Sequence, residues 1–304
     1  MKRGLPLACL VLALSARAQA GEPKRFYQMS PPEIARTLRD IHKENPALAD
    51  RVAAVSERFL GAPYDENGPL GEGPKGEFDR DPLIRFDTVD CTTLVEETMA
   101  LALEPNLKKA VRVLQKIRYK GGKIRYEDRN HFPEADWLPN NIEARYIRDI
   151  TREVAGDKTL RAGKVISKRK WYEAKSLQDI QGFNEASFQE KAERLYRLRA
   201  LGSRFPDRLA SVPYMPIQFL PSMLGGIPSG TIANLVREDS PDRVVLISHQ
   251  VLIIEKNGVK YVRQATLKGV VQDIPALEYF YRYFNSSWKL LGLNLDAIRD
   301  PRKR

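Results

Sequence analysis

Cys91 is the residue in this sequence best placed to act as a nucleophile. It opens a segment, residues 91–102, in which apolar residues recur at helical spacing, with Asp90 before it as a favourable N-cap and Pro105 after it as a stop. At the first position of a helix, free backbone N–H groups and the macrodipole favour a thiolate and can hold a developing oxyanion. The alternative interpretation is a structural cysteine that caps a core helix.

A thiol nucleophile needs a base, and the chain contains three histidines. His42 lies in a charged amphipathic stretch, which predicts a solvated helix surface. His131 lies in a polar loop rich in turn residues. His249 lies in the most strand-like segment, residues 243–254, where apolar residues on both faces predict a central buried strand. A buried histidine must be partnered. A satisfied core histidine is the alternative, but the candidate thiolate elsewhere favours His249 as the base.

The strand of His249 is followed by an Asn-Gly pair at 257–258, which predicts a two-residue hairpin turn. In the resulting register, His249 lies opposite Thr266, and Gln264 lies diagonally on the same face. Either side chain can orient the imidazole, as the third member of a Cys–His triad does. The alternative is an ordinary pair of polar strands.

The first twenty residues have the three parts of a secretory signal. Lys2 and Arg3 precede an apolar run at 5–15, and a small-x-small cleavage site occupies 18–20. The run is too short to span a bilayer, so a membrane anchor is the weaker alternative. We therefore predict a signal peptide at 1–20, a periplasmic or secreted mature chain, and no stable membrane insertion after cleavage. Cys9 leaves with the signal, so Cys91 has no disulfide partner in an oxidising compartment.

The 304 residues are 42% hydrophobic and 29% charged, which excludes a collagen, a disordered chain and a multi-span membrane protein. The formal net charge is +11, and the loss of three basic residues with residues 1–20 leaves +8. Such an excess suits an acidic partner. A nucleic-acid partner is not expected, because no stripe of basic and aromatic residues is present. No metal-ligand spacing, phosphate loop or dinucleotide fingerprint occurs, so we expect neither a metal nor another cofactor.

Several segments together resemble a known family, and they run from about residue 55 to 295. Their positions are 59–64, 68–73, 87–96, 129–141, 227–232, 248–253 and 261–271. The chain resembles the N-acetylmuramoyl-L-alanine amidase-like family of NlpC-type, papain-like cysteine hydrolases. The Asp-Cys-Thr-Thr block at 90–93 is the most specific of these matches.

The resemblance implies an α+β fold with a papain-like core, in which the nucleophile helix packs on a small antiparallel sheet that carries the histidine. Helical additions surround it, and the mature chain, 21–304, forms a single domain with a charged helical insertion around 155–205. By the same resemblance, Cys91 attacks an amide carbonyl, His249 transfers the proton and Gln264 is the third catalytic member. The bond joins muramic acid, notably anhydro-muramic acid, to L-alanine in peptidoglycan fragments.

The resemblance also implies the residues that contact the substrate. Tyr64 is expected beside the nucleophile, Asp90 beside the thiol, and His131, Trp137 and Asn141 near the sugar. Many relatives carry His-Ala-Ser where this chain reads Gln-Ala-Thr at 264–266. A glutamine can accept the imidazole N–H as a neutral partner. The expected partner is peptidoglycan or a muropeptide.

Two alternatives to the amidase stay open, an endopeptidase that cuts the murein stem peptide and a non-catalytic peptidoglycan-binding module.

For the remaining elements, helical patterns predict helices over 32–45, 47–60, 106–118, 141–154 and 185–204. A Pro- and Gly-rich stretch, 211–230, predicts a long ordered loop whose Tyr214 and Phe219 wall the cleft.

Overall fold

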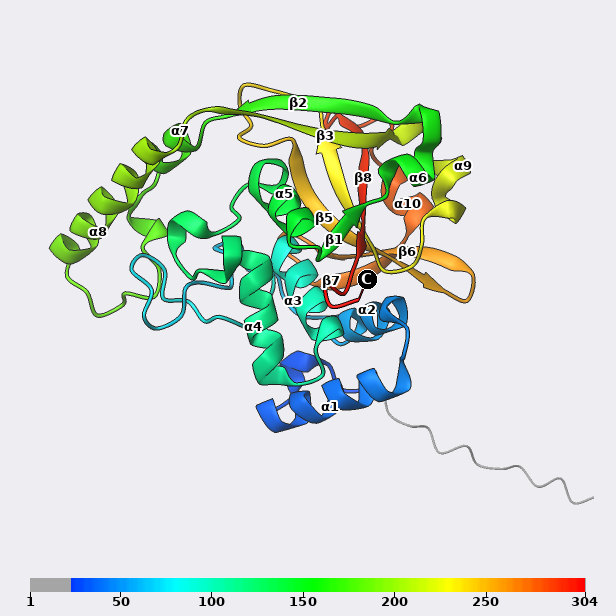
Figure 1. Ribbon diagram of the computed structural model, residues 1–304, viewed down its shortest axis with the longest axis horizontal. Helices are drawn as coiled ribbons and strands as arrows, with labels where there is room; N and C mark the ends of the chain where they lie inside the picture. Colours follow the sequence, from blue (N-terminus) through cyan, green and yellow to red (C-terminus); the bar gives the residue numbers. More distant parts are fainter. Residues whose placement is uncertain (1–22, 304) are drawn as a thin grey trace, which may run out of the picture.

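The computed structural model describes residues 23–303 as an α+β fold, one antiparallel sheet with helices packed around it (Figure 1). The predicted signal peptide lies outside the described residues. The α-helices are α1 (Pro31–Glu44), α2 (Leu48–Glu57), α3 (Cys91–Leu103), α4 (Leu107–Arg118), α5 (Leu138–Glu143), α6 (Thr151–Ala155), α7 (Lys168–Glu173), α8 (Phe188–Ala200), α9 (Leu220–Met223) and α10 (Ala276–Tyr281). The strands are β1 (Ile147–Asp149), β2 (Leu160–Ile166), β3 (Arg208–Pro216), β4 (Thr231–Arg237), β5 (Ile247–Lys256), β6 (Val259–Ala265), β7 (Val271–Pro275) and β8 (Leu290–Ile298).

The sheet is larger than the small sheet expected from the sequence. Its strands follow the order β2-β3-β8-β4-β5-β6-β7, with β1 paired to β8, and every pairing is antiparallel. The last strand in sequence, β8, lies between β3 and β4 in the interior of the sheet. The expectation failed because the Pro- and Gly-rich stretch 211–230 was predicted to be a loop, whereas its first six residues belong to β3. Pro213 and Pro216 lack a backbone N–H, but β3 still pairs with β2 through residues 208–214 and with β8 through residues 215 and 216.

The hairpin that carries His249 has the predicted register. Lys256 pairs with Val259 and Leu252 pairs with Arg263. Asn257 and Gly258 both have positive φ, at 50° and 77°, as a two-residue turn between twisted strands requires. The turn therefore fixes which residues of β6 face the His249 side of the sheet.

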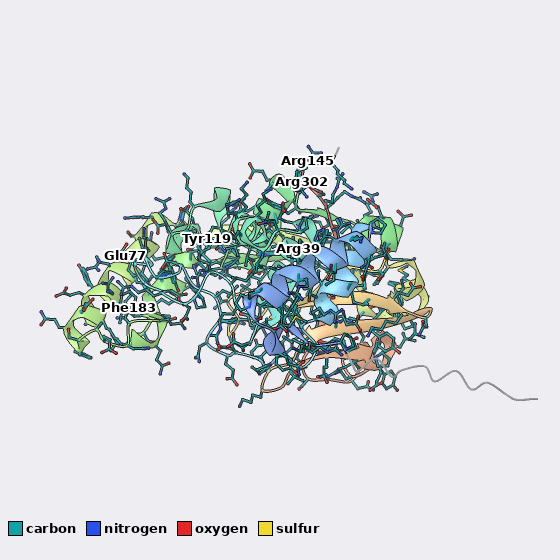
Figure 2. The ribbon with its side chains drawn as sticks, turned by 90° about the horizontal axis from the view of Figure 1, so that it is seen from below. Arg39, Glu77, Tyr119, Arg145, Phe183 and Arg302 are labelled. Atoms are coloured by element: carbon teal, nitrogen blue, oxygen red, sulfur yellow. The ribbon has the colours of Figure 1, made fainter. Side chains whose placement is uncertain are left out.

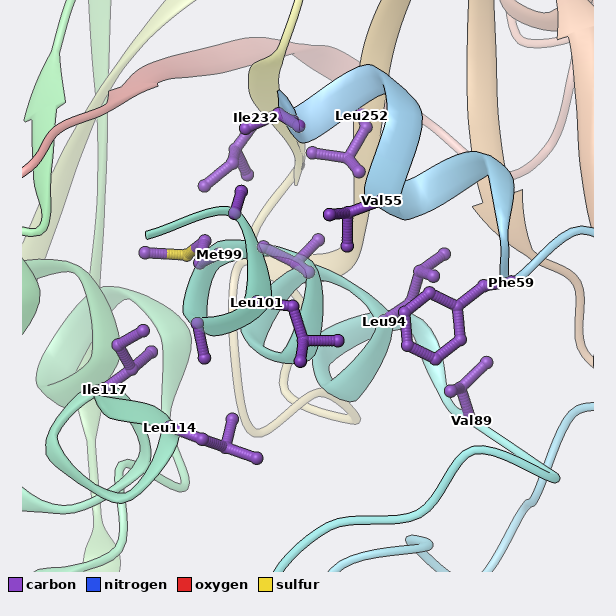
Figure 3. Close-up of a cluster of buried hydrophobic side chains, with 14 of the residues drawn as sticks. Val55, Phe59, Val89, Leu94, Met99, Leu101, Leu114, Ile117, Ile232 and Leu252 are labelled. Carbon is purple, nitrogen blue, oxygen red and sulfur yellow. The ribbon is translucent and has the colours of Figure 1, made fainter. Parts of the chain in front are cut away.

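Helix α3 is buried on nearly all sides rather than on a single apolar face. Every residue from 93 to 103 is buried, and the helix packs against α2, α4 and β5. Figure 3 shows Leu94, Met99 and Leu101 of α3 among side chains from α2, α4, β4 and β5. A helix enclosed in this way cannot shift easily, so its N-terminus is held rigidly against the sheet.

The helical predictions hold where the apolar spacing is strong and fail where a local break interrupts it. Helices α1, α2 and α4 lie within the predicted ranges to within a few residues, and α8 occupies most of 185–204. The predicted helix over 141–154 is wrong, because α5 ends at Glu143, Arg145 takes a left-handed φ of 63°, and β1 follows. A single left-handed residue reverses the chain direction and ends a helix.

The charged region around 155–205 is not wholly helical, since it begins with strand β2. Its helices α7 and α8 project to one side of the molecule, with Glu77 and Phe183 at the same end (Figure 2). They enclose a satellite core in which Phe78 and Tyr126 from the central chain meet Tyr172 and Leu198. This region is thus anchored to the loops that lead to the site. No helix within residues 23–303 is long and apolar enough to cross a membrane.

Candidate active site

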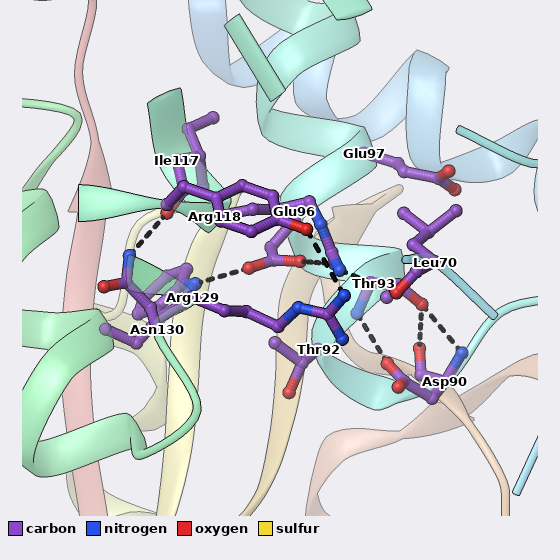
Figure 4. Close-up of polar contacts among 12 residues, drawn as sticks. Leu70, Asp90, Thr92, Thr93, Glu96, Glu97, Ile117, Arg118, Arg129 and Asn130 are labelled. Carbon is purple, nitrogen blue, oxygen red and sulfur yellow. Dashed lines mark hydrogen bonds and ion pairs between the residues drawn. The ribbon is translucent and has the colours of Figure 1, made fainter. Parts of the chain in front are cut away.

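Cys91 is the first residue of α3, as the sequence predicted. The Asp90 carboxylate accepts a hydrogen bond from the Thr93 backbone N–H at 2.6 Å, and the Thr93 hydroxyl accepts one from the Asp90 backbone N–H at 2.8 Å (Figure 4). This reciprocal cap fixes the start of the helix. The thiol is consequently held at the point where the N-terminus of α3 meets the sheet.

The thiol of Cys91 is protonated at neutral pH, contrary to the expectation of a thiolate. Burial and the adjacent Asp90 charge raise its pKa to about 11, although the backbone N–H of Gln250 lowers it. The helix terminus alone would favour the anion, but desolvation and a neighbouring carboxylate act in the opposite direction and are larger here. A nucleophilic role for Cys91 would therefore need a base that removes the thiol proton.

His249 has the geometry of such a base. Its Nε2 lies 2.7 Å from Gln264 Oε1, and the same oxygen accepts a hydrogen bond from the Tyr279 hydroxyl at 3.1 Å. Because an amide oxygen only accepts, Nε2 must carry the proton, which leaves Nδ1 of the neutral ring free to accept another. Burial lowers the pKa of His249, although Gln264 raises it in part. The imidazole is therefore neutral, and its unprotonated Nδ1 can accept a proton.

Of the two side chains that could orient His249, the structure brings Gln264 to it. The hydroxyl of Thr266 instead accepts a hydrogen bond from Gln272 at 2.8 Å. These contacts identify Gln264, rather than Thr266, as the side chain that orients His249.

Cys91 and His249 line the same cavity of about 280 Å³, together with Gln250, His131 and Trp171. No hydrogen bond joins the two side chains within residues 23–303. Both groups are neutral in this state, so the pair resembles a resting thiol and base rather than a preformed ion pair. Hydrogen bonds at catalytic pairs commonly tighten only when substrate binds.

Tyr64 lies beside the nucleophile, where the resemblance placed it. Burial raises the pKa of its hydroxyl, and the neighbouring Cys91 raises it further. A backbone bridge from Tyr64 to Val89 ties this loop to the residues just before α3. The neutral hydroxyl is available as a donor next to the sulfur.

His131 also reaches the cavity, and its ring is fixed between two aromatic side chains. Its centroid lies 4.6 Å from those of Tyr126 and Trp171, and Nε2 lies 2.9 Å from the Tyr126 carbonyl oxygen. Burial and the nearby Arg129 hold the pKa of His131 well below its usual value. It can therefore contact a ligand as a neutral ring, but it is not positioned to replace His249.

Three predicted substrate-binding residues have structural roles instead. Trp137 is 1% exposed and donates its indole N–H to Glu96, which also forms a buried ion pair with Arg118 at 2.6 Å. Asn141 is 1% exposed and donates to two backbone carbonyls. Asp90 caps α3. Trp137 lies in the π-helical turn at 133–137 and Asn141 in α5, and both side chains are buried, so neither can reach a ligand.

Two further expectations need correction. His42 is half-buried rather than solvated, and its Nε2 lies 2.7 Å from the Leu101 carbonyl oxygen, so it joins α1 to α3. Tyr214 and Phe219 do not line the cavity that holds Cys91. Tyr214 belongs to strand β3, and Phe219 lies in the 3₁₀ turn that follows it, so the stretch is not the open loop that was predicted.

Sequence reasoning missed Tyr279 and Trp171. Tyr279 lies on α10, is 1% exposed, and donates its hydroxyl proton to the Gln264 oxygen that also contacts the imidazole. Trp171 comes from α7, in the region interpreted as a charged insertion. A partial signal existed in the aromatic run at 279–284, but nothing local indicated which ring faces the hairpin.

Within residues 23–303 no group of three His, Cys, Asp or Glu side chains is arranged to hold a metal ion.

Comparison with known proteins finds solved structures with a similar fold. A Legionella pneumophila protein of family DUF1460 superposes with a TM-score of 0.81 at 30% identity, over 88% of this chain and 95% of that one. An N-acetylmuramoyl-L-alanine amidase from Bacteroides uniformis matches with a TM-score of 0.60 at 21% identity, over 83% and 99%. A Bacteroides fragilis protein provisionally named a xylanase matches at 24% identity and 0.58, over 80% and 98%. The last two show likeness of fold alone. No curated protein matches.

The family model of N-acetylmuramoyl-L-alanine amidase-like proteins matches residues 54–286, which contain Cys91, His249 and Gln264. This match spans most of the chain and confirms the resemblance seen in the sequence motifs. The protein belongs to the N-acetylmuramoyl-L-alanine amidase-like family.

Proposed function

We propose that the protein is a cysteine hydrolase that cleaves the amide between N-acetylmuramic acid and L-alanine in peptidoglycan fragments. The observation that carries the proposal is the His249–Gln264 hydrogen bond in the same cavity as Cys91. A histidine that merely filled the core would not line a cavity together with a thiol. A nucleophile helix packed against a sheet that carries a histidine and an amide supports the papain-like part of the proposal.

The reaction follows from the protonation states. His249 Nδ1 accepts the Cys91 proton as the sulfur attacks the amide carbonyl carbon, and negative charge develops on the carbonyl oxygen. We assign stabilisation of this oxygen to the Cys91 backbone N–H and the Tyr64 hydroxyl. The C–N bond then breaks, and the imidazolium returns its proton to the leaving L-alanine amine. Water, deprotonated by His249, hydrolyses the thioester and restores the thiol.

The proposal extends to an exported protein that acts on fragments with anhydro-muramic ends. Export is supported by the signal-like pattern of residues 1–20. The anhydro preference is supported by the family resemblance.

The test is mass spectrometry of digests by the mature chain, with Cys91→Ala as the inactive variant and Thr92→Ser as the matched control. Substrates are intact sacculi and purified muropeptides with reducing or anhydro ends. Release of a stem peptide that begins at L-alanine, absent with Cys91→Ala only, supports the amidase. Cuts within the stem peptide would indicate an endopeptidase, and no thiol-dependent product would indicate a binding module.

A further inference from the structure

Strand β5 is irregular at the point where it carries His249. In the ladder with β4, Leu235 pairs with His249. The next residue of β4, Val236, pairs with Ile247, so Ser248 is an extra residue in β5 and forms a β-bulge. A shift of the strand by one residue at this bulge would move the His249 side chain to the other face of the sheet. The direction of His249 therefore depends on what holds β5 here.

Backbone pairing between β5 and β6 stops short of the bulge. It begins at the hairpin turn and ends with Leu252 and Arg263. On the far side of the bulge, the Glu134 carboxylate accepts hydrogen bonds from the backbone N–H groups of Leu246 and Ile247. Between the bulge and residue 252, the strand that pairs with β5 among residues 23–303 is β4. The register at this point is thus set from the β4 side.

Three side-chain amides join β5 to β4 and β8 immediately beside the bulge, and we call them the amide rung. Gln250 Nε2 donates to Asn234 Oδ1 at 2.8 Å, and Asn234 Nδ2 donates to Asn294 Oδ1 at 2.8 Å. The same residues lie opposite each other in the ladders, with Asn234 between the other two. All three are at most 1% exposed. A slip of β5 by one residue would break the rung, so the rung selects one register.

A carboxylate fixes the direction of the hydrogen bonds in the amide rung. Asn294 Nδ2 donates to Asp149 Oδ2 at 2.9 Å, and Asp149 Oδ1 accepts the Thr151 backbone N–H at 2.8 Å. Because a carboxylate only accepts, Asn294 must present its oxygen to Asn234, and Asn234 must present its oxygen to Gln250. The rung is therefore anchored on β1, and its amides cannot reverse without losing these bonds.

Stability alone does not explain the amide rung, because the rung interrupts an apolar face. Ile232 and Leu252, each two residues from a rung amide on its own strand, belong to the core that contains α3. Asn234 also donates to the fully buried Asp296, and Gln250 Oε1 has no hydrogen-bond partner among residues 23–303. Apolar side chains would fill this position without an unpaired buried oxygen. Buried polar groups of this kind serve in other proteins to specify one register.

We propose that Asn234 is a positioning residue, whose amide locks the register of β5 at the bulge and so keeps His249 facing the candidate active site. The inference rests on the proposed function, because this direction matters to catalysis only if His249 is the base. The same register also places the backbone N–H of Gln250, which lowers the pKa of Cys91. Loss of the rung should therefore alter both the base and the thiol.

The first experiment measures the two groups without using the amidase reaction. In Asn234→Leu and, separately, in Gln250→Met, NMR follows the imidazole Cε1–H signal of His249, and iodoacetamide alkylates Cys91 at about pH 8. Both variants remove a rung amide at nearly constant size. The His249 signal is expected to split or broaden as β5 samples a second register. Alkylation is expected to slow by about threefold or more, because the sulfur loses the backbone donor that favours the thiolate.

The matched control is Thr231→Val, which removes a buried hydrogen bond from the same strand as Asn234. The Thr231 hydroxyl donates to the Pro228 carbonyl at 2.7 Å and lies outside the rung. This variant should lower the free energy of unfolding but leave the His249 signal and the alkylation rate unchanged. Equal changes in Thr231→Val, or no change in the rung variants, would overturn the proposal. Should Asn234→Leu fail to fold, Gln250→Met decides, because it leaves the other rung bonds intact.

The second experiment separates this proposal from the proposed function. The kcat and KM for cleavage of muramoyl-L-alanine are compared for the wild type, Asn234→Leu and Thr231→Val. Asn234 does not line the cavity of Cys91, so its loss should lower kcat by about tenfold or more and leave KM unchanged. An unchanged kcat, or a rise in KM alone, would refute the positioning role and leave the amidase intact. No cleavage by the wild type would refute the amidase, while the NMR and alkylation results would still decide the role of the rung.

Discussion

The hydrogen bond between His249 and Gln264 sets the proton affinity of the imidazole, and Gln264→Leu tests this directly. Leucine has a similar size but no acceptor, so the perturbation removes the 2.7 Å bond with little change in packing. In the wild type this bond raises the pKa of His249, against burial, which lowers it. A hydrogen bond to a charged group contributes about 1.5–3 kcal/mol, and one pKa unit is about 1.4 kcal/mol. The variant should therefore lower the pKa of His249.

The assay is NMR titration of the imidazole Cε1–H signals, which the presence of only three histidines makes tractable. The single variants His42→Gln and His131→Gln assign the other two signals. Tyr279→Phe is the matched control with the opposite sign, because it removes a competing donor from Gln264 Oε1 and leaves that oxygen a stronger acceptor. The pKa of His249 should rise slightly. An unchanged His249 pKa in Gln264→Leu, in a folded protein, would refute the orienting role.

Three other predictions follow from the same contacts. The rate of Cys91 alkylation by iodoacetamide should rise about tenfold per pH unit up to about pH 11, the pKa of the thiol, and a plateau below pH 8 would contradict this. Arg118→Met should destabilise the fold by about 3–5 kcal/mol in urea unfolding, because it leaves the Glu96 charge buried, and adding Glu96→Leu should recover most of that loss. Burial raises the pKa of Glu97 in the folded protein well above its usual value of 4.5. As the pH rises above 4.5, Glu97 therefore ionises in the unfolded chain before it ionises in the folded protein. The free energy of unfolding falls over this range, until the pH reaches the pKa of Glu97 in the folded protein. Glu97→Gln should remove up to about 1.4 kcal/mol per pH unit of that slope, measured by unfolding between pH 4 and 7.

The hairpin and the helix that position the site could be predicted from the sequence, because both depend on local chemistry. An Asn-Gly pair fixes a register, and Asp90 with the following apolar spacing fixes the first turn of α3. That register limited the partner of His249 to Gln264 or Thr266, and the hydrogen bond in the structure selects Gln264.

The rest depended on long-range packing, which local patterns do not encode. Trp137 and Asn141 belong to a matching motif, yet they point into the core because Glu96 and two backbone carbonyls need their donors. The prediction of a thiolate at Cys91 was also wrong, because the sequence shows the helix terminus but does not show how deeply the thiol is buried. Tyr279 and Trp171 reach the site from segments distant from the nucleophile in sequence.

The interior position of β8 makes completion of the sheet depend on a segment late in the sequence. Residues 290–298 separate β3 from β4, so β4, and through it the strand of His249, lacks one neighbour until this segment has been synthesised. Cys91 is made about two hundred residues earlier. The sheet that holds His249 near the start of α3 is therefore completed only late in synthesis, and a chain that terminates before residue 290 lacks the strand that separates β3 from β4.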